Sequence, residues 1–285
     1  MRPYDFAGVL TTGANGMIGS YVDFGIRTDR ETLDITDSES VLRYVQEHKP
    51  CAILHLAGAT DMERCERDPA YAYELNVRGT YNVARAARAV GATMVYTSTS
   101  RVFKGDKESA YAEDDFPEPA TQYGSTKHIG EMITAALVPN HIIARTSWVF
   151  GGGPERDNKF YGKVLKQLGG SEILALDDVR GCPTFGKDYV AAIKDLLAAE
   201  EYGIVHIANA GEATRFDIAS AMVSQLKPGL PVRAVDRSHF ASGATLPTNE
   251  SMLSKRCTLR PWQEALAEYI TTEWASYLQS ARIIT

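Results

Sequence analysis

The sequence lacks several features that would each indicate a particular class of protein. Its four cysteines are widely spaced and form no Cys-x2-Cys pair, so neither a disulfide framework nor a zinc site is predicted. Its six histidines show no ligand spacing, and no metal site is expected. The chain has no block of consecutive Lys or Arg, and its formal net charge is −6. This charge pattern argues against nucleic acid as a partner.

Long apolar runs are also missing. One of the longest, residues 52–57, is far too short to cross a bilayer, and the N-terminus has no signal-peptide core. We therefore expect a cytoplasmic protein with no membrane partner. The chain has 285 residues, of which 44% are hydrophobic and 23% charged. These values are typical of a globular protein with one large α/β domain or two fused lobes.

A glycine-rich turn follows the first expected strand. Residues 6–11 have the pattern of a short buried strand and lead directly into Gly13, Gly16 and Gly19. Such glycines permit a tight turn, close approach of the backbone to a pyrophosphate, and close packing of a helix on a strand. The helix N-terminus would present free N–H groups to the phosphates. The pattern predicts a dinucleotide site, and an ordinary turn is the alternative that the preceding strand disfavours.

The segment after this turn is unusually short. Too few residues separate Gly19 from Leu33 for a full crossover helix plus a strand. The first helix should therefore be only a turn or two, around residues 20–23, with residues 24–28 as the second strand. The exit of that strand carries Asp29, which would bind the ribose 2′-OH of NAD(H), and Arg30, which would accept a 2′-phosphate. The sequence is therefore compatible with either cofactor, and the presence of Arg30 and Arg27 favours NADP(H).

Further βα units follow in order. Residues 36–39 carry helix-capping side chains, and the helix that they open ends before Pro50. Residues 51–56 form the next expected strand, which ends in Ala57 and Gly58, where small side chains leave either room for a ligand or a plain turn. A helix over residues 69–90 and a strand over residues 92–97 come next.

Tyr123 and Lys127 are one helical turn apart in the helix-compatible segment 121–132. On one helix face their Cβ atoms would lie about 5–6 Å apart. An unperturbed phenol has a pKa of about 10; a lysine ammonium and a cationic nicotinamide ring would both lower it. The pair could then protonate a carbonyl oxygen while hydride reaches its carbon. Thr99, at the end of the preceding strand, could bond the same oxygen. Alternatively, Tyr123 and Lys127 mark a solvated helix face, and Thr99 caps a turn.

In combination these motifs resemble those of the extended short-chain dehydrogenases/reductases. The resemblance rests on the glycine turn from Thr12 to Gly19, the Ser98/Thr99 pair and Tyr123-x3-Lys127. Downstream, residues 145–151, 157–160 and 178–184 closely resemble the dTDP-4-dehydrorhamnose reductase branch of that superfamily. The similarity extends from about residue 8 to about residue 200, with a looser tail to 270.

The resemblance implies an α/β fold with a doubly wound parallel sheet, the Rossmann fold, and a smaller substrate-binding lobe. The Rossmann domain is expected over residues 1–149 plus about 182–207, and the lobe over about 150–181 plus 208–285. The implied activity is NADPH-dependent reduction of a 4-keto-6-deoxy nucleotide sugar, as in dTDP-rhamnose biosynthesis. The implied partner is that nucleotide sugar, and a homodimer is left open.

The family also implies a role for individual residues. Tyr123 would be the proton donor, Lys127 would hold the nicotinamide ribose and lower the phenol's pKa, and Thr99 would bond the keto oxygen. Trp148 would pack on the sugar, with a place in the core as the alternative. Ser100 and Arg101 complete the expected substrate residues. The expected cofactor residues are Gly13, Asn15, Gly16, Met17, Ile18, Gly19, Arg30, Asp34, Ile35, Leu56, Ala57, Gly58, Thr97, Tyr123 and Lys127.

Three features depart from the family pattern. Ser100-Arg101 stand where the family commonly has Asp-Tyr, Leu246-Pro247 stand where it has Arg-Pro, and the first helix is shortened. The first exchange removes a carboxylate and a phenol from the sugar pocket and adds a cation, which would suit a different or more acidic keto sugar. Two other functions remain open: a nucleotide-sugar epimerase or dehydratase of the same superfamily, and a non-catalytic regulatory subunit with this fold.

Overall fold

The computed structural model describes residues 4–239 and 247–281, so Leu246 lies outside the described residues. Its centre is a six-stranded sheet in the order β2-β1-β3-β4-β5-β10, and every neighbouring pair is parallel. This sheet confirms the doubly wound fold expected from the sequence. Its strands are β1 (Val9–Thr12), β2 (Ile26–Thr28), β3 (Ala52–His55), β4 (Thr93–Thr99), β5 (His141–Thr146) and β10 (Gly203–His206).

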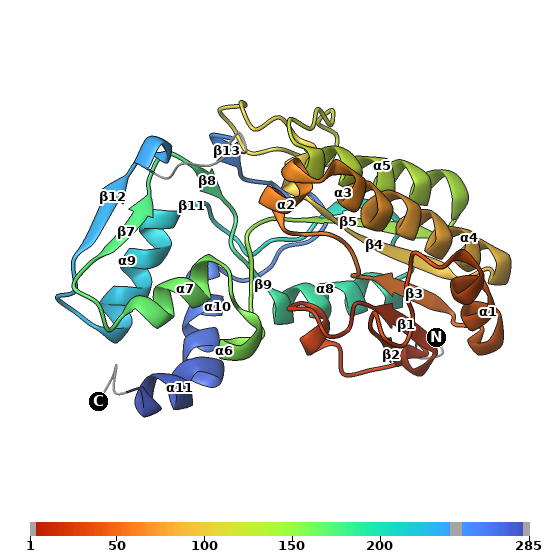
Figure 1. Ribbon diagram of the computed structural model, residues 1–285, viewed down its shortest axis with the longest axis horizontal. Coiled ribbons are helices and arrows are strands. Elements are labelled where there is room, and N and C mark those ends of the chain that lie inside the picture. The colour runs from red at the N-terminus through yellow and green to blue at the C-terminus, as the bar shows by residue number, and fades with distance from the viewer. Residues whose placement is uncertain (1–3, 240–246, 282–285) are drawn as a thin grey trace.

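Helices cover both faces of this sheet (Figure 1). Neighbouring side chains of a strand point to opposite faces. Leu10 and Ile53 pack with side chains of α1 and α4 on one face, whereas Val9 and Leu54 pack with side chains of α8 on the other. Burial on both faces explains why every residue of β1 and β3 is buried and why apolar side chains follow one another along these strands. The helices are α1 (Ser38–His48), α4 (Thr80–Val90) and α5 (Gln122–Leu137) on one face, and α8 (Gly186–Ala198) on the other.

Local sequence signals set the helix ends near the site. The Asp37 carboxylate accepts hydrogen bonds from two backbone N–H groups of the first turn of α1, at 3.1 Å each. This helix ends at His48 with Lys49 as its C-cap, before Pro50, as expected. Thr121 caps α5 in the same way, through the N–H of Gly124 at 3.1 Å. The first crossover is one 3₁₀ turn, Gly19–Tyr21, which confirms the expected shortening.

Two expected elements differ in detail. The strand expected over residues 6–11 begins only at Val9, because Asp5 caps a 3₁₀ turn over Phe6–Gly8. The helix expected over residues 69–90 is interrupted by a π-helical turn, Glu74–Gly79, between α3 (Pro69–Tyr73) and α4. The short helix α2 (Met62–Arg67) precedes α3.

Among the described residues, no helix is long and apolar enough to cross a membrane.

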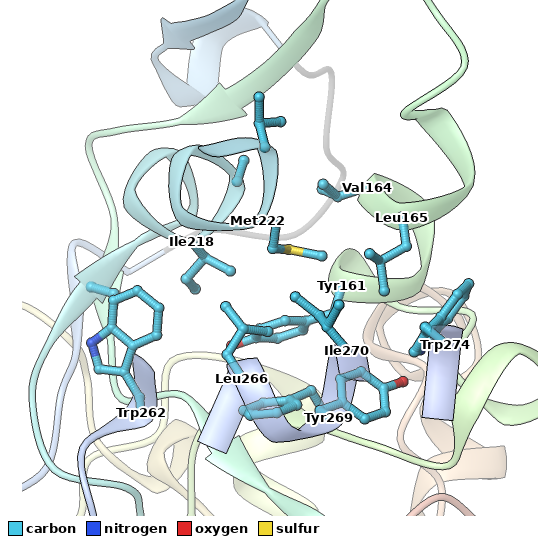
Figure 2. Packing of buried hydrophobic residues seen from close by; sticks show 14 of the residues in the cluster. Tyr161, Val164, Leu165, Ile218, Met222, Trp262, Leu266, Tyr269, Ile270 and Trp274 are labelled. Atoms are coloured by element: carbon cyan, nitrogen blue, oxygen red, sulfur yellow. The ribbon is translucent and has the colours of Figure 1, made fainter. Parts of the chain in front are cut away.

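The remaining segments pack around a second apolar core, rich in aromatic rings, between α7, α9 and α10 (Figure 2). They form three small sheets, β11-β8-β13, β12-β7 and β6-β9. Their use as a substrate-binding lobe stays a prediction. The elements are β6 (Val149–Phe150), α6 (Gly153–Arg156), α7 (Phe160–Gln167), β7 (Ile173–Leu176), β8 (Arg180–Gly181), β9 (Thr184–Phe185), β11 (Ala213–Thr214), α9 (Arg215–Leu226), β12 (Val232–Val235), β13 (Asn249–Glu250), α10 (Trp262–Tyr269) and α11 (Ala275–Ser280).

Candidate active site

A cavity of about 630 Å³ opens at the carboxyl ends of the sheet strands. The chain places β2 on one side of β1 and β3 on the other, so the strand order reverses at β1. Open α/β sheets bind ligands at such a point. Every expected cofactor and substrate residue except Asn15 lines this cavity. The structure therefore brings them together in one place, whereas their individual roles stay predictions.

The glycine turn forms the cofactor side of the cavity. Gly13 has a φ of +73°, and a Cβ there would lie 2.7 Å from the backbone nitrogen of Ala57. A Cβ on Gly19 would lie 2.6 Å from the carbonyl oxygens of Gly13 and Ala14. Only glycine fits at these two positions, because at Gly13 the turn packs directly on the loop that follows β3, and at Gly19 the chain folds back on the turn itself. The result is an exposed backbone surface of the kind that approaches a pyrophosphate.

The charged groups in β2 and directly after it have different positions relative to the cavity. Arg27 donates from Nη2 to the carbonyl oxygens of Ala14 and Gly19 at 3.3 and 3.4 Å, so it braces the glycine turn. Asn15 does not line the cavity; its side-chain amide donates a hydrogen bond to the carboxylate of Asp29 at 2.5 Å. Arg30 and Asp29 both line the cavity, so the groups suited to a 2′-phosphate and to a 2′-hydroxyl are both present.

Tyr123 enters the cavity from the first turn of α5. Burial raises the pKa of its phenol to about 12, and the side chain of Thr99 acts in the opposite direction. The lowering expected from Lys127 does not appear in the chain by itself: burial has the largest effect on the pKa of Tyr123, and the cation that acts to lower this pKa is Arg101. A phenol with this pKa is protonated throughout the neutral range, as a proton donor must be.

Lys127 lies one turn further along α5, against Tyr96 of β4. Burial lowers the pKa of its ammonium to about 7, whereas Glu131 acts to raise it. Its Nζ lies 4.1 Å from the centre of the Tyr96 ring, a cation–π contact. The Tyr96 hydroxyl donates to the Lys127 carbonyl at 3.2 Å, and a Cβ on Gly130 would lie 2.2 Å from that hydroxyl. The absence of a side chain at Gly130 thus leaves room for the Tyr96 ring, and the hydrogen bond from Tyr96 holds the backbone of Lys127 at a fixed position relative to β4.

A buried carboxylate ties α5 to the sheet beneath the cavity. Glu131 accepts two hydrogen bonds from Arg145, at 2.9 and 2.8 Å, and one from Ser98 at 2.5 Å. Burial would raise the pKa of Glu131, but these donors and His128 hold it at about 2. Ser98 therefore has a structural use, and Thr99 is the hydroxyl of the pair that interacts with Tyr123.

Arg101 forms a buried ion pair with Glu250, a residue that we did not predict as part of the site. Its Nε lies 2.8 Å from Oε2 of Glu250, and Ser100 Oγ lies 3.4 Å from the same oxygen. The exchange at these positions does place a cation in the cavity wall, but Glu250 in β13 neutralises its charge. The only signal in the sequence was that both residues lie in segments that depart from the family pattern.

Trp148 has a φ of +42°, which is unusual for a bulky side chain. Such a conformation costs about 1–3 kcal/mol, so its surroundings impose the ring's position. The guanidinium of Arg215 lies 3.8 Å from the centre of the indole ring. Arg215 covers one face of the Trp148 indole ring, so a sugar cannot pack on that face. The packing role expected of Trp148 is therefore limited to the rest of the ring.

Arg215 is a second cavity residue that the sequence analysis missed. It is the first residue of α9, after a capping box in which Thr214 and Asp217 bond each other's backbone N–H groups. The Thr-x2-Asp spacing could have indicated where this helix begins. Nothing local indicated that its first side chain would reach the cavity.

The parallel sheet, the glycine turn and the Tyr123/Lys127 pair in one cavity define a short-chain dehydrogenase/reductase of the extended type. The family described as "RmlD substrate binding domain" matches residues 7–274. The dTDP-4-dehydrorhamnose reductase of Streptomyces griseus is 34% identical over 291 residues, with 94% of each chain covered.

Solved structures agree with the sequence relatives. The dTDP-4-dehydrorhamnose reductase of Yersinia enterocolitica has a TM-score of 0.87 and 35% identity, covering 93% of this chain and 98% of its own. That of Bacillus anthracis, in complex with NADP, has a TM-score of 0.88 and 30% identity, covering 92% and 98%. The chain therefore belongs to the dTDP-4-dehydrorhamnose reductase-like family of extended short-chain dehydrogenases/reductases.

Proposed function

We propose that this protein is an NADPH-dependent reductase of a 4-keto-6-deoxy nucleotide sugar, the activity that its relatives' name describes. The observation that carries the proposal is that Tyr123, Lys127 and Thr99 line the same cavity as the glycine turn. A proton donor and a dinucleotide site in one cavity are what a carbonyl reduction requires. The relative solved with NADP supports NADP(H) as the cofactor, and NAD(H) is the alternative that Asp29 favours.

The chain's own residues would bind and protonate the substrate. Backbone N–H groups of Met17, Ile18 and Gly19 would hold the cofactor's pyrophosphate. Lys127 would hold the nicotinamide ribose, and Thr99 would donate a hydrogen bond to the keto oxygen. Tyr123 would then give its proton to that oxygen, and the ammonium of Lys127 would stabilise the phenolate that remains. The nicotinamide supplies the hydride when the cofactor is bound.

The test is a reductase assay on the purified protein with dTDP-4-dehydrorhamnose and a panel of other 4-keto nucleotide sugars. We expect the absorbance of NADPH to fall as substrate is added, with one alcohol product formed per NADPH oxidised. No oxidation with any of these sugars would contradict the proposal. Stoichiometric NAD⁺ released from the denatured protein would instead favour an epimerase or dehydratase, and binding without turnover would favour a non-catalytic subunit.

Two further points about the setting of the reaction stay predictions. We propose the cytoplasm as its location, because NADPH is an intracellular cofactor. A homodimer is the second point; Tyr81 of α4 and Met132 of α5 are large apolar side chains left exposed, at 45% and 51%. Sedimentation equilibrium would measure the mass of the assembly directly.

A further inference from the structure

The lobe side of the cavity holds more positive than negative charge. Arg101 has its carboxylate partner, Glu250, at 2.8 Å. Arg215 has none: among the described residues its guanidinium makes no hydrogen bond or ion pair, and its contacts are with the rings of Trp148 at 3.8 Å and Phe160 at 4.7 Å. Both cations line the cavity, so the unpaired one is accessible to a ligand there.

The acids near Arg215 are already occupied. Glu250 bonds Arg101, and the buried carboxylate of Asp157 accepts hydrogen bonds from Tyr269 and from the backbone of Lys159. A further cation, Lys159, also lines the cavity and repels Arg215 electrostatically. Within residues 4–239 and 247–281, therefore, no carboxylate near Arg215 is free to compensate its charge.

Other polar atoms around Arg215 also lack partners. Nε1 of Trp148, which can only donate, and the hydroxyl of Tyr161 are buried with no hydrogen-bond partner in the described protein. The contacts of the guanidinium with two aromatic rings leave its N–H edge as the part that can form hydrogen bonds. A planar N–H edge of this kind matches two oxygens of a phosphate or carboxylate.

We propose that Arg215 is the anion-binding residue of the substrate cavity and that it holds the diphosphate of the nucleotide sugar. This inference rests on the proposed function. A diphosphate fits better than a single carboxylate because two cations, Arg215 and Lys159, line the cavity close enough to repel each other. A carboxylate on the sugar ring is the second source of the same oxyanion chemistry, and the experiment separates the two. Arg215 would act in binding and orientation, and Tyr123 would remain the residue that transfers a proton.

The experiment is calorimetric titration of NADPH-saturated protein with dTDP and, separately, with thymidine. A charge-assisted hydrogen bond contributes about 1.5–3 kcal/mol, so Arg215→Gln should weaken dTDP binding by roughly 10- to 100-fold. Thymidine, which has no phosphate, should bind both proteins equally. Arg215→Lys keeps the charge and should lose less. The matched control is Arg180→Gln, which removes a half-exposed arginine of β8 that faces Glu212 and should bind dTDP like the wild type.

Each outcome decides the inference. Weaker dTDP binding with unchanged thymidine binding supports the diphosphate site. Unchanged dTDP binding by Arg215→Gln overturns the diphosphate site. If the same variant then shows a raised KM only for keto sugars that carry a carboxylate, Arg215 binds that carboxylate instead. If Arg215→Gln fails to fold, the Arg215→Lys variant decides. A lysine cannot make a bidentate contact, so wild-type affinity of this variant for dTDP would contradict a bidentate contact between Arg215 and the diphosphate. A wild-type protein that binds dTDP through Arg215 but reduces no keto sugar would refute the proposed function alone.

Discussion

Arg101 and Glu250 join the two parts of the molecule through one buried ion pair. Their nearest side-chain atoms are 2.8 Å apart, and only 9% and 6% of the two side chains are exposed. Arg101 lies two residues after the end of β4 of the large sheet, whereas Glu250 belongs to β13 of the small sheet β11-β8-β13. The pair therefore fixes one wall of the cavity relative to the other and keeps that wall electrically neutral.

Removing one member of this pair should be worse than removing both. Glu250→Gln leaves the guanidinium of Arg101 buried without a counter-charge, which costs about 3–5 kcal/mol. The double variant Arg101→Met with Glu250→Gln removes the buried charge and should recover much of that loss. Urea unfolding of the wild type, both single variants and the double variant measures the coupling. Additive losses would show that the two side chains do not depend on each other.

Glu131 should make stability depend on pH in the acid range. Its folded pKa of about 2 lies below its ordinary value of 4.5, so its contribution is complete above about pH 4.5 and is lost as the pH falls toward 2. The contribution is up to about 3 kcal/mol. Glu131→Gln should be less stable at neutral pH and should lack this part of the pH dependence. Equal slopes of unfolding free energy against pH in both proteins would contradict the assignment.

Lys127 should make NADPH binding depend on pH near neutrality. Burial lowers the pKa of its ammonium to about 7, so the group is charged below that pH and neutral above it. We expect the Kd for NADPH to rise as the pH increases through 7, by roughly three- to tenfold, because a charged donor binds more strongly than a neutral one. Fluorescence titration of wild type and Lys127→Met tests this. The variant should bind more weakly at low pH and show no such step; parallel curves would exclude Lys127 as the source.

The sequence was most informative where a chemical group and its structural setting are close together in the chain. The glycine turn follows its strand directly, and Tyr123 and Lys127 share one helix, so the combination of these motifs in one chain indicated a common ligand, which the Tyr/Lys spacing by itself did not. Arg215 and Glu250 could not be recognised in this way, because their relation to the cavity depends on contacts with Trp148 and Arg101 from distant segments. The task of Arg27 was equally hidden, since its partners are backbone carbonyls.

The proposed mechanism depends above all on the phenol of Tyr123 as the proton donor. The most direct test is Tyr123→Phe, assayed for keto-sugar reduction at saturating NADPH together with a titration of NADPH affinity. We predict that kcat falls by roughly 10²-fold or more while the Kd for NADPH stays near the wild-type value, because only the acid is removed. Full turnover by the variant would contradict the account and would require another group in the cavity to supply the proton.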